Sequence, residues 1–264
     1  MRLLSDLTVT QVGAGVATTR RLAGLARTTA HRHRIADAEQ AIHDILTTAG
    51  RCYVAVSGGK DAAALLALAA PLARTLGVPL VAAWSDDELE YPEQREYVPR
   101  LCESLGVDLW IWCGHARHGG WFRSWHEPPY WTEPHPLARN APGPDHVGGQ
   151  RSMAALGYDG VLLGLRAQES RQRAIHARWR GRVYPIAGGR WRAQPLAWWT
   201  VEDVWALLLD RAVPVNPVYA RLASIGVPLE EQRVGPLPLC RREDLRRGWP
   251  VLYPRLVARY GERW

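Results

Sequence analysis

The chain has 264 residues, of which 47% are hydrophobic, so it is long enough to bury the core of one large α/β domain. Its formal net charge of +7 favours an anionic partner, such as a nucleotide, sulfate or nucleic acid, without choosing among them. The longest apolar tract, residues 62–84, is broken by two prolines and an arginine, and the first residues lack the apolar core of a signal peptide. We therefore expect no membrane span and a cytoplasmic location.

The first 34 residues form an N-terminal extension with weak periodicity, compatible with either a helix or a mobile arm. From residue 35 to residue 48 the apolar side chains recur at helical spacing, and Gly50 stands where a helix end is expected. We therefore expect a helix over 35–48 that leads into the first strand.

Residues 35–220 show the alternation of short apolar strands and helices that is typical of a nucleotide-binding parallel sheet. The expected strands are 53–56, 80–84, 109–112 and 160–164, and the helices between the first three are 60–76 and 93–105. The predicted fold class is α/β, with a Rossmann-like parallel sheet and helices on both of its faces.

Residues 114–149 form a long insertion in this domain, rich in Trp, His, Pro and Gly. Because such a length exceeds that of a plain connector, we interpret the insertion as a lid over a substrate, with a passive insertion as the alternative. Trp121 and Trp125 are its candidates for packing on a base or substrate, and core packing is their alternative role.

The last part of the chain predicts a hairpin and several helices. Residues 182–195 indicate a hairpin that turns at Gly188-Gly189, and Thr200–Asp203 is typical of a capping box opening a helix over 201–209. Residues 221–264 are expected to form a C-terminal helical segment packed on the nucleotide-binding domain.

The residues Ser57-Gly58-Gly59-Lys60-Asp61 lie where a buried strand ends and a helix begins. Backbone N–H groups and the helix dipole favour an anion there, and glycines let the backbone wrap around phosphate oxygens. Lys60, the only lysine in the chain, adds a positive charge, and Asp61 is a candidate ligand of Mg²⁺ accompanying the phosphates. The spacing is not that of a Walker A loop, and an ordinary Gly-Gly turn is the alternative.

Ser-Gly-Gly-Lys-Asp after an apolar strand resembles the pyrophosphate loop of the adenine nucleotide α-hydrolase-like superfamily of PP-loop ATP pyrophosphatases. Further segments resemble the phosphoadenosine phosphosulfate reductase family within it, namely Ser85–Glu93, Gly164–Arg173, Pro195–Trp205 and Pro214–Tyr219. They occur in the same order as in that family, and the resemblance as a whole covers roughly residues 35–260. The resemblance implies the fold of that superfamily and an adenine nucleotide as ligand, with ATP and Mg²⁺ as the expected cofactors.

Arg166 follows the carboxyl end of an expected strand, where α/β sheets place ligand contacts, and its planar guanidinium suits a phosphate or sulfate. Glu169 is expected to orient Arg166 or to contact a ribose, with a surface ion pair between the two as the alternative. The predicted nucleotide-binding residues are Ser57, Gly58, Gly59, Lys60, Asp61, Asp86, Gly164, Arg166, Glu169 and Arg173, of which Lys60 and Arg166 are also predicted to be catalytic.

Three polar residues of the resembling segments have plain structural alternatives. Asp86 occupies the acidic position of its segment, and a helix N-cap is its alternative role. Asn216 and Tyr219 are expected to cap and pack the final helices, and we leave them out of the catalytic set.

The cysteines, at 52, 102, 113 and 240, form no C-x-x-C pair. A reductase of this family carries its nucleophile in a Glu-Cys-Gly-like context, whereas Cys240 lies in Pro236-Leu-Pro-Leu-Cys-Arg-Arg-Glu243. The adjoining arginines favour a lowered thiol pKa and keep Cys240 as a candidate nucleophile, with a buried thiol as the preferred interpretation. Other members carry a cluster cysteine where Val234–Cys240 has a proline, so no iron–sulfur cluster is expected.

The leading hypothesis is a PP-loop ATP pyrophosphatase that adenylates an acceptor and releases pyrophosphate, with sulfur incorporation into nucleic acid or a small molecule as one use. The alternatives are a thiol-dependent phosphosulfate reductase that uses Cys240, and a nucleotide-sensing or nucleic-acid-binding module. The last rests on an arginine-rich surface comprising Arg171, Arg173, Arg178, Arg180 and Arg182. The sequence leaves open the acceptor, any sulfur donor, and whether the protein is a homo-oligomer.

Overall fold

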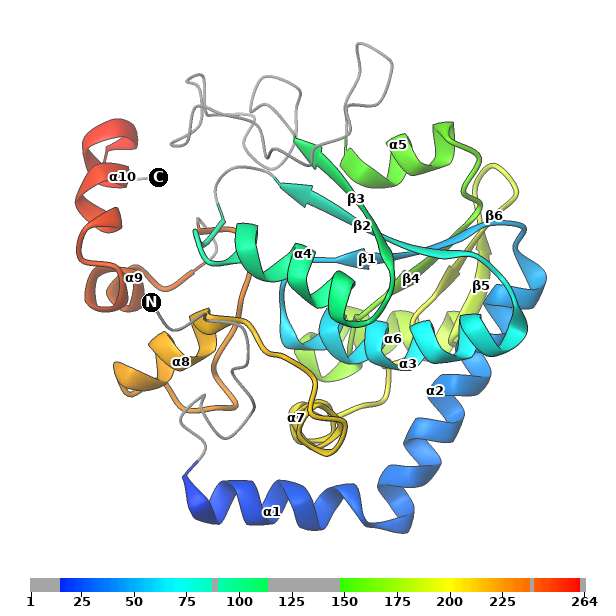
Figure 1. The fold of residues 1–264 in the computed structure, drawn as a ribbon, viewed down its shortest axis with the longest axis horizontal. Coiled ribbons are helices and arrows are strands. Elements are labelled where there is room, and N and C mark those ends of the chain that lie inside the picture. Colours follow the sequence, from blue (N-terminus) through cyan, green and yellow to red (C-terminus); the bar gives the residue numbers. More distant parts are fainter. Residues whose placement is uncertain (1–14, 87–89, 114–147, 238–239, 262–264) are drawn as a thin grey trace.

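The computed structural model describes residues 15–86, 90–113, 148–237 and 240–261, and its centre is a six-stranded sheet (Figure 1). The strands are β1 (Cys52–Val56), β2 (Leu80–Asp86), β3 (Asp108–Cys113), β4 (Gly160–Leu163), β5 (Val183–Ile186) and β6 (Arg190–Ala193). They follow the order β3-β2-β1-β4-β6-β5, and every neighbouring pair is parallel except the β5–β6 hairpin. The predicted α/β fold is confirmed, and its four expected strands are β1 to β4.

The helices connect these strands and extend the chain at both ends. They are α1 (Val16–Ala26), α2 (Thr29–Thr48), α3 (Lys60–Leu76), α4 (Gln94–Ser104), α5 (Gly148–Ala155), α6 (Arg171–Arg180), α7 (Val201–Asp210), α8 (Pro217–Ser224), α9 (Arg242–Gly248) and α10 (Leu252–Tyr260). A 3₁₀ turn, η3 (Ala167–Glu169), lies between β4 and α6. Within the described part of the chain, none of the helices combines the length and apolar character that crossing a membrane requires.

Both faces of the sheet are covered by helices. Successive strand residues point to opposite sides of the sheet, so neighbouring residues of one strand pack in different core clusters. Val54 and Leu162 belong to the larger core cluster, together with buried residues of α2, α3, α4 and α7. Tyr53 and Val161 point the other way and pack with Met153 of α5. Figure 1 accordingly shows α5 on one side of the sheet and α3 with α4 on the other.

Helix α3 has the bounds that the sequence predicts, and local signals explain both of its ends. It begins directly after Gly59, its N-cap, and ends at Gly77, whose φ of 67° lies in the left-handed region that favours glycine. Most of its alanine and leucine side chains are buried against the sheet and α7. The β5–β6 hairpin likewise turns at Gly188 and Gly189, both of which have positive φ angles.

Helix α2 begins at Thr29 instead of near residue 35, so the expected boundary after residue 34 lies inside a helix. The Thr28 side chain caps this earlier start by accepting a hydrogen bond from the N–H of His31. The His31 side chain is buried and lies 3.1 Å from the carboxylate of Asp203 in α7. The N-terminal helices are thus fixed to the domain by a polar contact that joins distant parts of the sequence.

Asp203 is the centre of this polar contact. Its carboxylate is fully buried, accepts from Arg34 at 2.8 Å, and completes the predicted capping box with Thr200 at the start of α7. Burial opposes ionisation, but the hydrogen bonds from His31 and Thr200 and the charge of Arg34 outweigh it and lower the pKa of Asp203 to about 2.

Asp203→Asn should therefore lower the free energy of unfolding by about 2 kcal/mol at neutral pH, since the pKa falls from its ordinary 3.8 to about 2 on folding. A depressed pKa stabilises the fold only while the carboxyl is ionised. The difference from wild type should be complete above about pH 4 and disappear as the pH falls through about 2. Urea unfolding at a series of pH values measures this difference.

The matched control is Asp44→Asn, which neutralises an exposed carboxylate of α2 and should change the free energy by no more than about 0.5 kcal/mol. A difference between wild type and Asp203→Asn that stays constant down to pH 2 would contradict the assignment of its stabilising effect to the ionised carboxylate.

Candidate functional site

The candidate site lies at the carboxyl ends of β1 and β4, where the strand order changes direction. β1 leads to β2 and β3 on one side, whereas β4, its other neighbour, leads to β6 and β5. In open α/β sheets, ligands bind in the crevice outside the strand ends at such a switch point. The loop Ser57–Lys60 follows β1, and the segment Gly164–Glu169 follows β4, so the fold brings the two main predicted segments together.

The loop after β1 is held in a conformation that requires glycine. Gly58 has a φ of 70°, and a Cβ added to it would lie 3.0 Å from Cγ of Gln94 in α4. The Gln94 amide donates to the carbonyl oxygen of Ser57 at 2.8 Å. The loop is therefore fastened to the start of α4, which excludes a loosely held Gly-Gly turn.

Asn216, the N-cap of α8, and Tyr219, within that helix, also bind this loop, a role that sequence reasoning missed. Asn216 caps α8 as expected by accepting from the N–H of Val218, but its Nδ2 also donates to the carbonyl oxygen of Gly58 at 3.0 Å. The hydroxyl of Tyr219 accepts a hydrogen bond from the N–H of Lys60 at 2.7 Å. The signal that could have identified both residues is their position in Asn216-Pro-Val-Tyr219, part of a segment that resembles the phosphosulfate reductase family.

Two buried cations meet at the carboxylate of Asp61. Lys60 Nζ lies 3.2 Å from Asp61 Oδ2, and Arg166 Nε lies 2.5 Å from Asp61 Oδ1. The side chains of Lys60 and Arg166 are both only 2% exposed, whereas that of Asp61 is 17% exposed. Arg166 and Glu169 do form an ion pair, at 3.8 Å, but the alternative of a surface pair is wrong because the guanidinium of Arg166 is buried beside the loop Ser57–Lys60.

Glu169 links this pair to further arginines. Its carboxylate accepts from the backbone N–H of Arg166 at 3.1 Å, bonds to Arg173, and lies 3.8 Å from Arg233. Glu169 also lies 3.8 Å from Nη2 of Arg166, so it contacts the side chain that it was expected to orient. Among these described side chains, Lys60 and three arginines face only two carboxylates, so the cluster carries an excess of positive charge.

The excess positive charge affects the titration of Lys60. Burial lowers the pKa of Lys60, and the nearby Arg166 and Arg233 lower it further, while Asp61 acts in the opposite direction. A buried cation that is destabilised by neighbouring cations gains from an additional anion. The electrostatics of this cluster therefore suit a polyphosphate or sulfate.

Asp86, the acidic residue of the Ser85–Glu93 segment, lies at the end of β2 and is fully buried. Its carboxylate forms an ion pair with Arg95 of α4 at 3.3 Å. Helix α4 has Glu93 as its N-cap, so the alternative role of Asp86 as a helix cap is wrong. Asp86 stands at the same edge of the sheet as the phosphate loop, one strand away.

Cys240 does not have the environment that its adjoining arginines suggest. Burial raises the pKa of its thiol to about 11, and the nearby Asp244 and Glu90 raise it too, while a hydrogen bond with Tyr91 lowers it. The expected lowering of the pKa is therefore wrong, because the burial of the thiol dominates. The sulfur lies 3.5 Å from the carbonyl oxygen of Pro236, a contact that fits a structural role.

The protein side chains near the loop could hold a Mg²⁺ ion only together with phosphate oxygens of a bound nucleotide. No group of three or more His, Cys, Asp and Glu side chains in the described ranges is arranged to hold a metal ion. Mg²⁺ commonly binds through one or two carboxylates plus phosphate oxygens and water, and Asp61 provides one carboxylate beside the loop. The role of Asp61 as a metal ligand and the expected lack of an iron–sulfur cluster both stay predictions.

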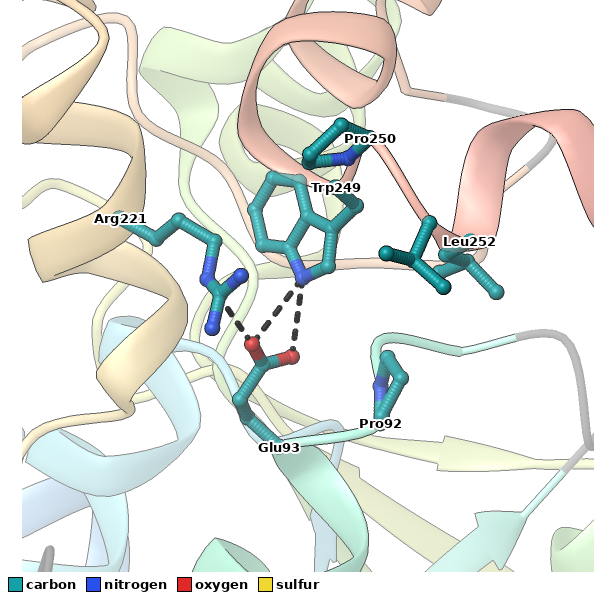
Figure 2. Close-up of a pocket in the computed structure, with 7 residues that line it drawn as sticks. Pro92, Glu93, Arg221, Trp249, Pro250 and Leu252 are labelled. Atoms are coloured by element: carbon teal, nitrogen blue, oxygen red, sulfur yellow. Dashed lines mark hydrogen bonds and ion pairs between the residues drawn. The ribbon is translucent and has the colours of Figure 1, made fainter.

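The predicted lid at 114–149, with Trp121 and Trp125, lies almost entirely outside the described residues, and only its last two positions belong to α5. A separate cavity of about 360 Å³ lies between the start of α4, α8 and the α9–α10 segment (Figure 2). Its polar wall is Glu93, which accepts from Trp249 Nε1 at 3.0 Å and pairs with Arg221 at 3.2 Å. The cavity contains none of the predicted nucleotide-binding residues.

The close approach of β4 to α3 joins the two halves of the site. A Cβ added to Gly164 would lie 3.0 Å from both the carbonyl carbon and the carbonyl oxygen of Asp61. Backbone atoms cannot give way as a flexible side chain can, so a side chain at position 164 would separate Arg166 from Asp61.

Gly164→Ala should lower the free energy of unfolding by about 1–3 kcal/mol and weaken phosphate binding, because the added methyl forces β4 away from α3. The matched control is Gly24→Ala in α1, where an added Cβ has nothing within 4 Å and should stabilise by up to about 1 kcal/mol. Thermal or urea unfolding of both variants measures the effect, and a Gly164→Ala variant as stable as wild type contradicts it.

Comparison with known proteins gives one family and several distant relatives. The model of the phosphoadenosine phosphosulfate reductase domain matches residues 51–229. Sulfate adenylyltransferase subunit 2 of Rhizobium meliloti (strain 1021) is 24% identical over 215 residues, which cover 72% of this chain and 68% of that protein. The uncharacterized protein YbdN of Escherichia coli (strain K12) is 25% identical over 222 residues, and the match covers 72% of this chain but only 55% of YbdN.

Among solved structures, the FMN adenylyltransferase of Candida glabrata in complex with FAD and inorganic pyrophosphate is similar to this fold. The TM-score is 0.50 at 12% sequence identity, and the match covers 81% of this chain and 69% of that chain. At this identity the likeness concerns the fold alone.

Proposed function

Because the chain belongs to the phosphoadenosine phosphosulfate reductase domain family, we propose that it binds ATP with Mg²⁺ and adenylates an acceptor, releasing pyrophosphate. The observation that carries the proposal is the convergence of two buried cations, Lys60 and Arg166, on the carboxylate of Asp61, which directly follows a glycine-rich loop at the switch point of the sheet. The name of the relative from Rhizobium meliloti, a sulfate adenylyltransferase subunit, supports adenylyl chemistry.

In this reaction the loop Ser57–Lys60 binds the β- and γ-phosphates, and the α-phosphorus faces the open end of the sheet. An acceptor oxygen forms a bond to the α-phosphorus, the bond from that phosphorus to the pyrophosphate oxygen breaks, and pyrophosphate leaves with the electron pair. Lys60 and Arg166 stabilise the negative charge that develops on the phosphate oxygens. Asp61 is the residue that would hold Mg²⁺, which when bound neutralises phosphate charge.

The surrounding residues position these groups. Gln94, Asn216 and Tyr219 fix the backbone of the loop, so the site is ordered before the nucleotide arrives. Asp61 and Glu169 pair with different nitrogens of the Arg166 guanidinium, Nε at 2.5 Å and Nη2 at 3.8 Å. The bidentate shape of that group then suits the phosphate chain better than a point charge does.

Lys60→Ala should weaken binding of ATP with Mg²⁺ by about tenfold to a hundredfold, because a charged hydrogen bond to phosphate is lost. Arg166→Lys keeps the charge but loses the planar fork, and should slow pyrophosphate release by about a hundredfold with a smaller effect on ATP binding. Calorimetric titration with ATP and a pyrophosphate assay with candidate acceptors measure the two effects.

The matched control is Arg246→Gln, which removes an exposed arginine of α9 and should leave both ATP binding and pyrophosphate release unchanged. Tight ATP binding without pyrophosphate release under any acceptor would contradict catalysis and favour a nucleotide sensor. Unchanged ATP binding in Lys60→Ala would contradict the assignment of the loop itself.

The thiol-dependent reductase is tested through Cys240. Since burial raises the pKa of this thiol to about 11, it stays protonated at neutral pH and is a poor nucleophile. We expect no sulfite from phosphosulfate with a thiol donor, and we expect Cys240→Ser to bind ATP as wild type does. Sulfite release that is lost in Cys240→Ser would establish the reductase in place of the adenylating enzyme.

A further inference from the structure

The segment that follows the candidate site is unusually basic. Residues 166–192 contain eight arginines and a single carboxylate, Glu169. Helix α6 lies in the middle of this segment and starts directly after Ser170, its N-cap. A run of positive charge with so few acids repels itself, and an anionic polymer would relieve that repulsion.

Helix α6 makes little use of its side chains for packing. Ala177 is its only buried residue. On the same inner side, Arg173 bonds to Glu169, and the guanidinium of Arg180 lies 5.9 Å from the centre of the Tyr184 ring. The inner side of α6 is therefore accounted for by contacts with the protein itself.

The outer side of α6 carries a basic and aromatic stripe. Arg171, Ile175, Arg178 and Trp179 are spaced by four, three and one residues, which places them on one helix face. Trp179 is 86% exposed and Ile175 is 46% exposed, and both arginines are exposed. Within the described ranges, no acidic side chain forms an ion pair with Arg171 or Arg178.

We propose that this stripe of α6 binds a single-stranded segment of nucleic acid. Arginines that lack acidic partners suit the phosphates, and an exposed indole offers a flat face on which an unpaired base stacks. A duplex keeps its bases stacked inside, so the indole selects a single strand or a loop. Because α6 follows Arg166 and Glu169 so closely, the bound strand lies beside the candidate nucleotide site.

The proposal goes beyond the proposed function and does not depend on it, because strand binding requires neither ATP nor turnover. The test measures fluorescence anisotropy of labelled single strands of RNA and DNA of about 16 nucleotides, and of the matched duplex, over a range of salt concentrations. Wild type should bind a single strand more tightly than the duplex, with affinity falling steeply with salt. The RNA and DNA arms identify the preferred strand.

Trp179→Ala should weaken strand binding by about tenfold, whereas Trp179→Phe, which keeps an aromatic face, should retain most of it. The double variant Arg171→Gln and Arg178→Gln should reduce the salt slope by about 1.4, the value for two lost phosphate contacts on a single strand. These side chains are exposed, so the variants should keep the thermal midpoint of wild type.

Arg246→Gln on α9 removes the same charge elsewhere, and its binding should stay close to that of wild type. The proposal is overturned by any of three results: no binding to either strand at low salt, stripe variants that bind as wild type does, or an equal loss in Arg246→Gln. Displacement of the strand by an equal length of polyglutamate would also overturn it, since the surface would then recognise charge alone.

Discussion

The ion pair between Asp61 and Arg166, with 2.5 Å between Oδ1 and Nε, joins two segments that lie 105 residues apart in the chain. It forms at the switch point between β1 and β4, and it depends on Gly164, whose lack of a side chain lets the chain after β4 approach the backbone of Asp61. Breaking a buried pair by removing one partner leaves an uncompensated charge, which is costly. The geometry of the whole site therefore follows from this contact.

Around the ion pair, the loop is held from the side of the C-terminal half. Asn216 and Tyr219 bind Gly58 and Lys60, and the backbone carbonyl of Val234 would lie 3.6 Å from a Cβ on Gly59. Figure 1 shows α8 below the sheet and α9 and α10 beyond its strand ends. Asn216 and Tyr219 thus help to hold the loop, although neither belongs to the predicted catalytic set.

Local signals made much of the fold predictable. The alanine-rich run after Lys60, the Gly188-Gly189 turn and the Thr200–Asp203 box each act over a few residues, and each element formed as expected. The missed features depend on contacts between distant segments. Helix α2 starts early because of the Thr28 cap and the buried His31–Asp203 contact. The pKa of Cys240 is set mainly by burial of the thiol, which cannot be inferred from the adjoining arginines in the sequence. The hydrogen bond between Tyr219 and the N–H of Lys60 was missed for the same reason, since the two residues lie 159 positions apart in the sequence.

A crystal structure with Mg²⁺ and an ATP analogue that has a methylene between its α- and β-phosphorus atoms tests the central claim most directly. We expect the β- and γ-phosphates to contact the backbone of Gly58–Lys60 and the ammonium of Lys60, with the α-phosphorus exposed on the side of Arg166. Phosphates bound away from this loop, for example in the cavity beside Glu93 and Trp249, would contradict the account. The reverse orientation, in which the γ-phosphate instead of the α-phosphorus faces the open end of the sheet, would contradict it equally.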